Sequence, residues 1–260
     1  MIEYKSTAEL DCMYAANQIV ATVRDELAAR VAPGVSTAEL DEYAEARVRE
    51  LGGEPAFKGY RGFPATVCAS LNEEIVHGIP SPTRRLAPGD ILGLDLGVRL
   101  DGFYGDSAIT VPVPPLEPEV SRLLDVTAEA LDCAIEQCTV GNRIGDISNA
   151  VQQHVESAGF SVVREFVGHG IGASLHEDPQ IPNFGAPGVG VRLRPGMVLA
   201  IEPMVNLGAA PVEVLDDGWT AVTVDRKPSA HFEHSVAITD GAPWVLSASG
   251  AREMARVASR

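Results

Sequence analysis

The sequence predicts an α+β domain made of two similar halves, and three observations lead to this prediction. Helical patterns alternate with groups of short strand-like runs, once within residues 6–115 and again within 117–240. Glycines that flank predicted helices recur in pairs, Gly34 with Gly141 and Gly52 with Gly159, whose numbers differ by the same offset of 107. The segment 86–98 (LAPGDILGLDLGV) aligns with 193–205 (LRPGMVLAIEPMV) at this offset. We expect one domain over residues 1–260, with two repeats at roughly 12–115 and 119–240.

The first half opens with two predicted helices. Ser6-Thr-Ala-Glu9 is a capping-box pattern, and the apolar stripe that follows it ends at Pro33-Gly34. Ser36-Thr-Ala-Glu39 begins a second helix, which closes at Gly52-Gly53. Strand-like runs separated by Gly and Pro then cover residues 65–71, 90–98 and 105–113.

The second half repeats this order. Helices are predicted near 117–138 and 144–158, and strand-like runs cover 160–166, 197–205, 220–225 and 232–239. Because Pro-Gly turns are common, their chance recurrence is the alternative explanation. The shared offset favours a true repeat, which is too long for a solenoid unit. The alignment places Asp95 and Glu202 at equivalent strand positions.

Composition limits the classes of function. The chain has 260 residues, of which 45% are apolar, with a mean hydropathy of +0.06, so it contains enough apolar residues for a buried core. A formal charge of −16 disfavours nucleic-acid and membrane-surface binding. The N-terminal residues lack a signal pattern, and no stretch reaches the roughly 18 apolar residues of a membrane span. The four cysteines form no C-x-x-C pair, which predicts reduced thiols and a cytoplasmic protein.

Two acids in the first half point to a cation. Residues 90–113 read as two strands joined by a turn. If the hairpin is centred between residues 100 and 101, Asp95 lies directly opposite Asp106, and two facing carboxylates in an apolar strand need a shared proton or a cation between them. The alternative is a one-residue shift in register, which would send one acid to solvent.

The second half supplies more candidate ligands. Glu202 lies in the apolar run 197–205, Glu233 lies in HFEHSV, and GHGIGASLHEDP carries His169 and His176. Lone buried acids are rare. The four carboxylates of Asp95, Asp106, Glu202 and Glu233 would be neutralised by two divalent cations. An oxygen-rich set with one imidazole favours manganese, iron or cobalt over structural zinc.

Five separated segments resemble one enzyme family, in order and in spacing. They are residues 59–80 (GYRGFPATVCASLNEEIVHGIP), 94–108 (LDLGVRLDGFYGDSA), 163–180 (VREFVGHGIGASLHEDPQ), 201–206 (IEPMVN) and 217–239 (DGWTAVTVDRKPSAHFEHSVAIT). On these motifs the chain is similar to the type I methionine aminopeptidases. The resemblance implies the pita-bread fold, in which two pseudo-symmetric halves surround a curved antiparallel β-sheet flanked by helices.

The same resemblance implies a set of site residues. Two divalent metal ions would be held by Asp95, Asp106, His169, Glu202 and Glu233, with Asp106 and Glu233 bridging them. His77, His176 and Glu202 would be catalytic, with both histidines facing the substrate. The methionine pocket would be formed by Tyr60, Phe63, Cys68 and Trp219, although Phe63 and Cys68 also read as ordinary core residues.

The activity implied is removal of N-terminal methionine from nascent proteins with a small second residue, through water activated by the two metals. We expect a cytoplasmic monomer that acts near the ribosome and binds neither nucleic acid nor membrane. The alternatives are prolidase- or creatinase-like enzymes, a type II methionine aminopeptidase and a non-catalytic binding protein of this fold. Four positions depart from residues frequent in the family, and none is a predicted ligand: Phe57, Gly97, Tyr104 and Leu175.

Overall fold

The first two helices begin at the predicted capping boxes. The computed structural model describes residues 2–249, and in it α1 spans Thr7–Ala28 and α2 spans Thr37–Glu50. The hydroxyl of Ser6 accepts the Glu9 N–H, while the Glu9 carboxylate accepts the Ser6 N–H. Ser36 and Glu39 repeat this arrangement. Each box therefore satisfies two main-chain donors that a helix start leaves free.

The second pair of helices matches its prediction within two residues. Helix α3 spans Pro118–Glu136 and α4 spans Ile144–Ser157. Both ends of α4 lie at the positions that the repeat makes equivalent to the ends of α2. Gly34 and Gly141, which precede these helices, adopt φ values of +89° and +103°, a region that favours glycine.

In the first half the two central strands, β4 (Ile91–Leu100) and β5 (Phe103–Pro112), are long and continuous. The other strands of this half are β1 (Glu54–Pro55), β2 (Val67–Leu71) and β3 (Glu74–Val76), with a short 3₁₀ turn, η1, at Tyr60–Gly62. Strand β4 pairs antiparallel with β5, β2 and β1. The β4–β5 hairpin turns through Asp101-Gly102, so Asp106 pairs with Gly97 and Asp95 pairs with Ala108. The predicted direct pairing of Asp95 with Asp106 is therefore wrong by two residues.

That error leaves both acids on the same face of the sheet. Side chains alternate with a period of two, so a slip of two residues preserves the face whereas a slip of one reverses it. The turn lies one residue later than predicted because Asp101 takes a left-handed φ of +49° and Gly102 a φ of +87°. Such a pair of positive φ values is typical of a two-residue hairpin turn.

In the second half the corresponding strands are short and interrupted. They are β6 (Ser161–Val162), β7 (Val167–Gly170), β8 (Glu177–Pro182), β9 (Val198–Ile201), β10 (Met204–Asn206), β11 (Val212–Val214), β12 (Ala221–Thr223), β13 (Ser229–His231), β14 (His234–Ala237) and β15 (Trp244–Val245). The predicted strand 197–205 is broken after Ile201, and β14 pairs with β9 while β13 pairs with β10.

The two halves share detailed contacts at equivalent positions of the repeat. An isolated bridge joins Ser36 to Arg85 in the first half, and its counterpart joins Arg143 to Arg192. Strand β1 pairs with β4 in the same register in which β6 pairs with β10. The predicted α+β class with two pseudo-symmetric halves is confirmed, whereas the repeat limits 12–115 and 119–240 stay predictions.

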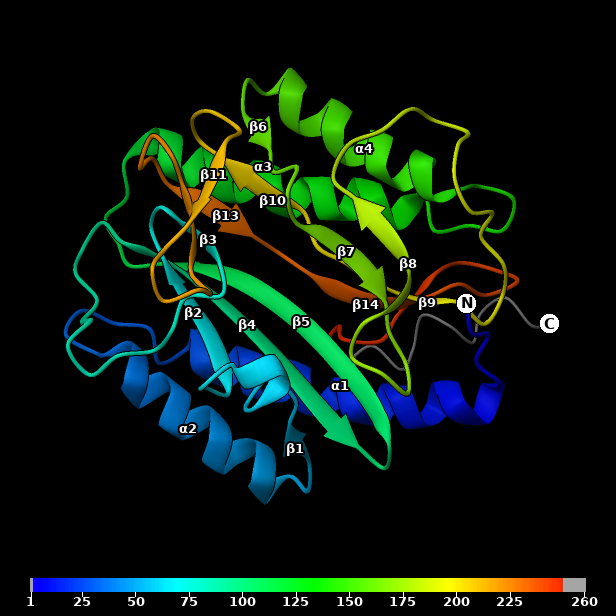
Figure 1. The fold of residues 1–260 in the computed structure, drawn as a ribbon, viewed down its shortest axis with the longest axis horizontal. Helices are drawn as coiled ribbons and strands as arrows, with labels where there is room; N and C mark the ends of the chain where they lie inside the picture. Colours follow the sequence, from blue (N-terminus) through cyan, green and yellow to red (C-terminus); the bar gives the residue numbers. More distant parts are fainter. Residues whose placement is uncertain (1, 250–260) are drawn as a thin grey trace.

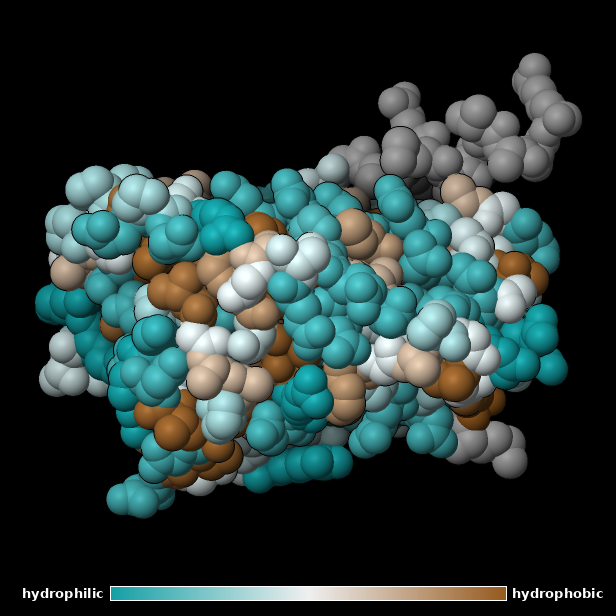
Figure 2. Space-filling view, turned by 90° about the horizontal axis from the view of Figure 1, so that it is seen from above, coloured by the Kyte–Doolittle hydropathy of each residue, from teal (hydrophilic) through white to brown (hydrophobic). Residues whose placement is uncertain are grey.

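The strands lie between two helical layers (Figure 1). Helix α1 packs on β4 and β5, α2 packs on β1 and β2, and α3 and α4 pack on the strands of the second half. The face in Figure 2 carries small apolar areas between hydrophilic ones, and no continuous apolar band crosses its described part. Within residues 2–249 no helix has the length and apolar character to cross a membrane.

Candidate active site

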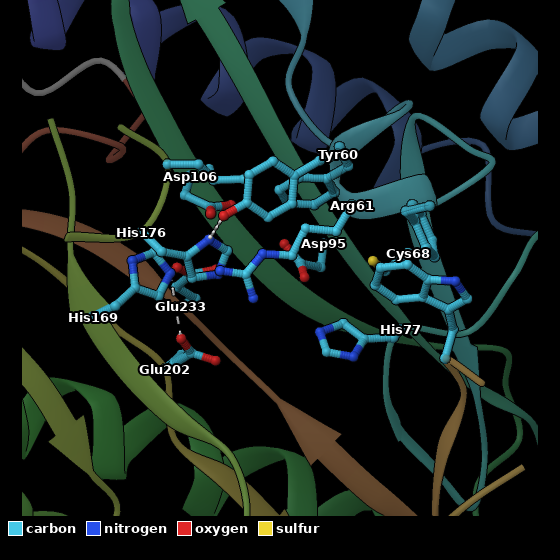
Figure 3. A pocket seen from close by; sticks show the side chains of 14 residues that line it. Tyr60, Arg61, Cys68, His77, Asp95, Asp106, His169, His176, Glu202 and Glu233 are labelled. Atoms are coloured by element: carbon cyan, nitrogen blue, oxygen red, sulfur yellow. Dashed lines mark hydrogen bonds and ion pairs between the residues drawn. The ribbon is translucent and has the colours of Figure 1, made fainter. Parts of the chain in front are cut away.

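One cavity of about 140 Å³ brings all the predicted site residues together (Figure 3). Its acidic end is lined by Asp95, Asp106, His169, Glu202 and Glu233, and the rest of its wall by Phe57, Tyr60, Arg61, Phe63, Cys68, His77, Leu175, His176 and Trp219. Residues from both halves of the chain therefore meet in one place. Of the lining residues only Arg61 had no role in the sequence prediction.

The first half contributes its acids from two unbroken strands. Asp95 of β4 and Asp106 of β5 are diagonal neighbours on one face of the hairpin. The backbone of Asp95 also pairs with Cys68 of β2, which places the thiol beside the carboxylate. Burial, followed by the neighbouring acids Asp95 and Asp106, raises the pKa of Cys68 well above its usual range, so this thiol is neutral.

The second half contributes its acids from breaks between strands. Glu202 lies between β9 and β10, directly before Pro203, which has no N–H to donate to a strand ladder. Glu233 lies between β13 and β14, and its N–H donates to Ala108 O of β5 at 2.9 Å. His169 comes from β7. Figure 3 shows all three side chains directed into the cavity.

The acidic cluster is electrostatically costly without a counter-ion. Burial raises the pKa of Asp95 to about 7. Burial first, and then the negative charges of the other acids, raises the pKa values of Asp106, Glu202 and Glu233 well above the usual range. One oxygen each of Asp95, Asp106 and Glu233 is buried without a hydrogen-bond partner among the described residues. Buried carboxylate oxygens without a hydrogen-bond donor need a proton or a cation as a partner, so this set fits the ligands of a metal ion.

The geometry around His169 fits a cation as well. Its Nδ1 lies 2.9 Å from the carbonyl oxygen of Gly170, which can only accept, so Nδ1 donates and Nε2 carries the free lone pair. Nε2 faces Oε1 of Glu202 at 3.7 Å. Ligand atoms of Asp106, His169 and Glu233 also lie within 4.8 Å of one another. A lone pair and carboxylates that converge at these distances match a set of metal ligands.

Aromatic side chains form the less polar end of the cavity. The rings of Phe63 and Trp219 meet edge to face with centroids 5.2 Å apart, and Trp219 contacts His77 in the same manner at 6.1 Å. His77 has a left-handed φ of +62°, which holds it at the end of β3 in a conformation that non-glycine residues rarely adopt. Burial lowers the pKa of His77, so the ring is neutral at neutral pH.

His176 and Tyr60 stand together at the mouth. The Tyr60 hydroxyl lies 3.0 Å from Nδ1 of His176, and the two rings stack with centroids 5.3 Å apart. The ring of His176 also packs on His169 at 4.2 Å. Desolvation by this packing, and then the neighbouring His169 and the cation of Arg61, lowers the pKa of His176 to about 3.

Comparison with known proteins identifies the family. Residues 11–240 match the sequence pattern described as metallopeptidase family M24. The methionine aminopeptidase 1 of Bacillus subtilis (strain 168) is 52% identical over 240 residues, which cover 92% of this chain and 96% of the relative. The chain belongs to metallopeptidase family M24. The predicted resemblance and the class of metal-dependent hydrolase are thereby confirmed.

Solved structures of other proteins show the same architecture. The methionine aminopeptidase of Thermotoga maritima superposes with a TM-score of 0.94 at 44% identity, over 95% of this chain and 99% of that one. A prolidase from Pyrococcus furiosus gives a TM-score of 0.78 at 20% identity, and the match spans 95% of this chain but 65% of that one. The prolidase likeness concerns the fold alone, and it confirms the predicted pita-bread architecture.

In this M24 chain, buried hydroxyl groups tie the two halves together behind the acids. Ser107 Oγ donates to Glu233 O at 2.6 Å, and Ser235 Oγ donates to Asp106 O at 2.9 Å. Arg24 of α1 donates to Ser107 Oγ at 2.8 Å, and the hydroxyl of Ser247 accepts the Ser235 N–H at 3.1 Å. The backbones that carry Asp106 and Glu233 are thus cross-linked from both sides, which fixes the distance between their carboxylates.

Two atypical residues of this M24 chain compensate each other. A Cβ at Gly97 would lie 2.5 Å from Cε1 of Phe57, closer than atoms can approach. The absence of a side chain at position 97 therefore makes room for the Phe57 ring, which lines the cavity wall. The sequence identified both positions as departures from the family, but only the three-dimensional contact links them.

Two residues close to the acids had no role in the sequence prediction. His231, at the end of β13, is buried, and its Nε2 lies 3.8 Å from Oε2 of Glu202 without a hydrogen-bond partner among residues 2–249. Burial lowers the pKa of His231 to about 3. Because His231 lies two residues before the predicted ligand Glu233, the sequence could have identified it as a candidate site residue. Arg61 gave no such signal, because it lies in a glycine-rich turn far from any predicted ligand.

Proposed function

We propose that this M24 metallopeptidase removes the N-terminal methionine from polypeptides whose second residue is small. One observation carries the proposal: a single cavity joins a cluster of buried, partner-less carboxylates to a wall of aromatic rings, among the residues that the structure describes. Such a site holds a cation beside an apolar side chain at the end of a peptide. The roles proposed for the residues are those that the family resemblance implies, and this arrangement supports them.

Two divalent cations are proposed to occupy the acidic end, held by Asp95, Asp106, His169, Glu202 and Glu233. The oxygen-rich ligands favour manganese, iron or cobalt. When bound, such a pair lowers the pKa of water towards about 7 and polarises the carbonyl of the scissile bond. In this chain the cations would also neutralise the repulsion that raises the pKa values of the acids.

Three side chains are proposed to manage the proton and the developing charge. Glu202 takes the proton of the attacking water and passes it to the leaving amine. His77 and His176 donate hydrogen bonds to the scissile amide and to the oxygen that becomes negative in the transition state. Their lowered pKa values keep both rings neutral at pH 7, so each can donate through one nitrogen without adding a charge.

The methionine side chain is proposed to lie against Tyr60, Phe63, Cys68 and Trp219. Its thioether is polarisable and packs favourably on the edges of aromatic rings, and the neutral thiol of Cys68 adds a small apolar surface. The anchored methionine leaves little space around the scissile bond, between His77 and His176, for the side chain of the second residue. A rigid wall of this kind rejects added methylene groups at a cost of about 1–3 kcal/mol.

We further propose that the substrates are N-termini of nascent chains emerging near the ribosome, and that the enzyme is a cytoplasmic monomer. The net charge of −16 is the argument against direct binding of nucleic acid or anionic membrane.

A peptide panel tests the proposed function. Met-Ala and Met-Gly tripeptides should be cleaved, Met-Leu and Met-Lys tripeptides should be cleaved orders of magnitude more slowly, and an Xaa-Pro dipeptide should be resistant. A chelator should abolish all cleavage, and manganese should restore it. Preference for the Xaa-Pro substrate would replace the proposal with a prolidase activity, and absence of cleavage with manganese, iron or cobalt would indicate a binding protein.

Variants of the two histidines test their proposed roles. His77→Ala and His176→Ala should each retain two metals per chain and lower kcat by roughly 10²-fold. Metal content is measured on the folded variants by elemental analysis. Loss of metal from either variant would make that histidine a ligand.

A further inference from the structure

Arg61 is a charged residue of the cavity to which the proposed reaction assigns no task. It lies in the turn η1, and its side chain lines the cavity together with Asp95 and His176. Figure 3 shows the Arg61 side chain extending from this turn across the opening, next to Tyr60. The position of this guanidinium at the mouth of an acidic site calls for a reason.

The Arg61 guanidinium has no carboxylate partner among the residues that the structure describes. Within residues 2–249 it takes part in no ion pair or hydrogen bond, it lies 5.3 Å from the centroid of the Tyr60 ring, and its charge acts on the neighbouring His176. Arg24, a buried arginine behind the acids, behaves differently, because it donates to Ser107 and to the carbonyl of Ser247. Arg61 is therefore free to bind an anionic group from outside the chain.

The backbone at Arg61 is held in an unfavourable conformation. Its φ of +49° and ψ of +20° lie in the left-handed region, between Gly59 and Gly62, which also have positive φ values. A non-glycine residue in this region costs of order 1 kcal/mol or more, and such strain concentrates where function requires it. The strained turn places the exposed side chain of Arg61 at the opening of the cavity.

A second cavity shows which part of a substrate passes Arg61. This outer cavity shares Arg61, His169 and His176 with the first, and its remaining wall is formed by Glu3, Val167, Glu177, Asp178 and Gln180. Figure 3 shows Cys68, a member of the proposed methionine pocket, on the opposite side of the first cavity from His176. Residues that follow the scissile bond would therefore leave through the outer cavity and pass Arg61. Of the acids there, Glu3 and Glu177 both contact Lys5, at 3.5 Å and 2.6 Å, which partly neutralises them.

We propose that Arg61 binds a carboxylate of the substrate downstream of the scissile bond and so makes this enzyme favour acidic over basic residues at the third position. The inference rests on the proposed function. The same carboxylate chemistry is present at the free C-terminus of a tripeptide, which would then be cleaved faster than its amide. The second residue is excluded as the source because the proposed reaction needs it to be small.

The test compares the amidated peptides Met-Ala-Asp-Gly-Gly, Met-Ala-Asn-Gly-Gly and Met-Ala-Lys-Gly-Gly. The wild-type protein should show kcat/KM about fivefold higher for the Asp than for the Lys peptide at low salt, mainly through KM, and the difference should shrink at high ionic strength. Arg61→Asn removes the charge and tolerates a positive φ, so it should reduce the ratio to near one. Arg61→Lys should retain most of the preference, and Arg49→Gln on α2 should leave it unchanged as a control for net charge.

A second arm separates the two sources of carboxylate, since Met-Ala-Ser as free acid and as amide differ only at the C-terminus. The wild type could prefer the free acid of Met-Ala-Ser over its amide, and Arg61→Asn could remove this preference without changing the Asp-to-Lys ratio at the third position. That result would overturn the assignment of Arg61 to the side chain of the third residue. Equal Asp-to-Lys ratios in wild type and Arg61→Asn would overturn the role of Arg61 while the proposed function stands. Failure of the wild type to cleave the neutral Asn peptide would reject the proposed function and this inference together.

Discussion

The two halves of this molecule present their acids in different ways. In the first half β4 and β5 are uninterrupted, and Asp95 and Asp106 are diagonal neighbours on one face of the hairpin. In the second half Met204 pairs with His231, and Ile201 pairs with His234. The same register continues across the strand breaks between these two pairs, so Glu202 lies directly opposite Glu233. Gly97, which pairs with Asp106, is equivalent in the repeat to Met204, which pairs with His231. In the second half His231 therefore occupies the position that corresponds to Asp106.

This difference shows how a repeat can acquire an asymmetric site. The first half places carboxylates by the alternation of side chains along a strand, which requires no special backbone. The second half places them at interruptions, one of which is enforced by Pro203. It also contains residues 207–228, between β10 and β13, where the β11–β12 hairpin and Trp219 lie against β3 of the first half. Both halves therefore line the cavity, the first with Tyr60, Phe63 and Cys68 and the second with Trp219.

The largest effect should come from removal of one acid from each half. Asp106→Asn and Glu233→Gln should each lower kcat/KM for a Met-Ala tripeptide on the order of 10³-fold, because each removes a charge that the cation pair requires. Metal content should fall in both variants. Asp101→Asn, in the turn of the same hairpin, is the control and should retain full activity and metal. A much smaller effect of one substitution would show that only the other half holds the cations.

A change at the strand break should have an intermediate effect. Pro203→Leu restores a main-chain donor and copies Leu96 of the first half, so the strand can run on and displace Glu202. A shift of about 1 Å in a catalytic group lowers the rate by up to 10²-fold, and we expect a loss of at least about tenfold in kcat/KM with little change in thermal stability. The reverse change, Leu96→Pro, should instead prevent stable folding, because it removes a donor from the centre of the sheet. Full activity of Pro203→Leu would mean that the break is not needed to place Glu202.

The contact between Gly97 and Phe57 should contribute measurably to the stability of the first half. Gly97→Ser should destabilise the protein by about 1–3 kcal/mol through overpacking against the Phe57 ring. In the double variant with Phe57→Cys the cost of Gly97→Ser should largely disappear, which a double-mutant cycle of denaturant unfolding would reveal. Gly93→Ser in the same strand is the matched control, because its Cβ would meet Ser70 at an ordinary 3.4 Å. Additive effects would contradict the compensation.

The smallest expected effect is a pH dependence of stability that appears only with a chelator. Above pH 7 the buried histidines, whose pKa values are lowered by burial, are neutral in the folded state, and in the unfolded state, where the pKa is about 6.5, they are mostly neutral as well. The raised pKa values of the carboxylates mean that the metal-free folded state still binds protons that the unfolded state has lost. Stability should therefore decrease as the pH rises from 7 to 8, by about 1 kcal/mol, or 2–4 °C in melting temperature, for each proton retained.

Excess manganese provides the comparison for this measurement, because bound cations keep the acids ionised in the folded state. The melting temperature with manganese should be higher at both pH values and should not fall between pH 7 and 8. A melting temperature of the chelated protein that is constant or rises over this interval would contradict the raised pKa values of the cluster.

Local sequence patterns were sufficient to predict the helices α1, α2, α3 and α4 and to identify the acids in apolar runs. Capping boxes at Ser6 and Ser36 and glycines with positive φ are local devices, so most helix ends could be predicted within about two residues. The exception is α1, which ends at Ala28 and not at the predicted Pro33-Gly34. Glu202 and Asp95 were identified because a carboxylate in an apolar run violates the usual pattern of burial. The internal repeat was visible because equivalent turns need the same residues in both halves.

The tertiary structure alone decided how these residues meet. The pairing of Asp106 with Gly97 depends on where the turn falls, and neighbouring registers with the same face satisfy the hydrophobic pattern equally well. The contacts of Phe57 with Gly97, and of Arg24 with Ser107, join residues from separate elements that no local pattern relates. The place of Arg61 at the cavity mouth likewise follows from a strained turn, because backbone conformation and distant packing, rather than residue type, set the direction of its side chain.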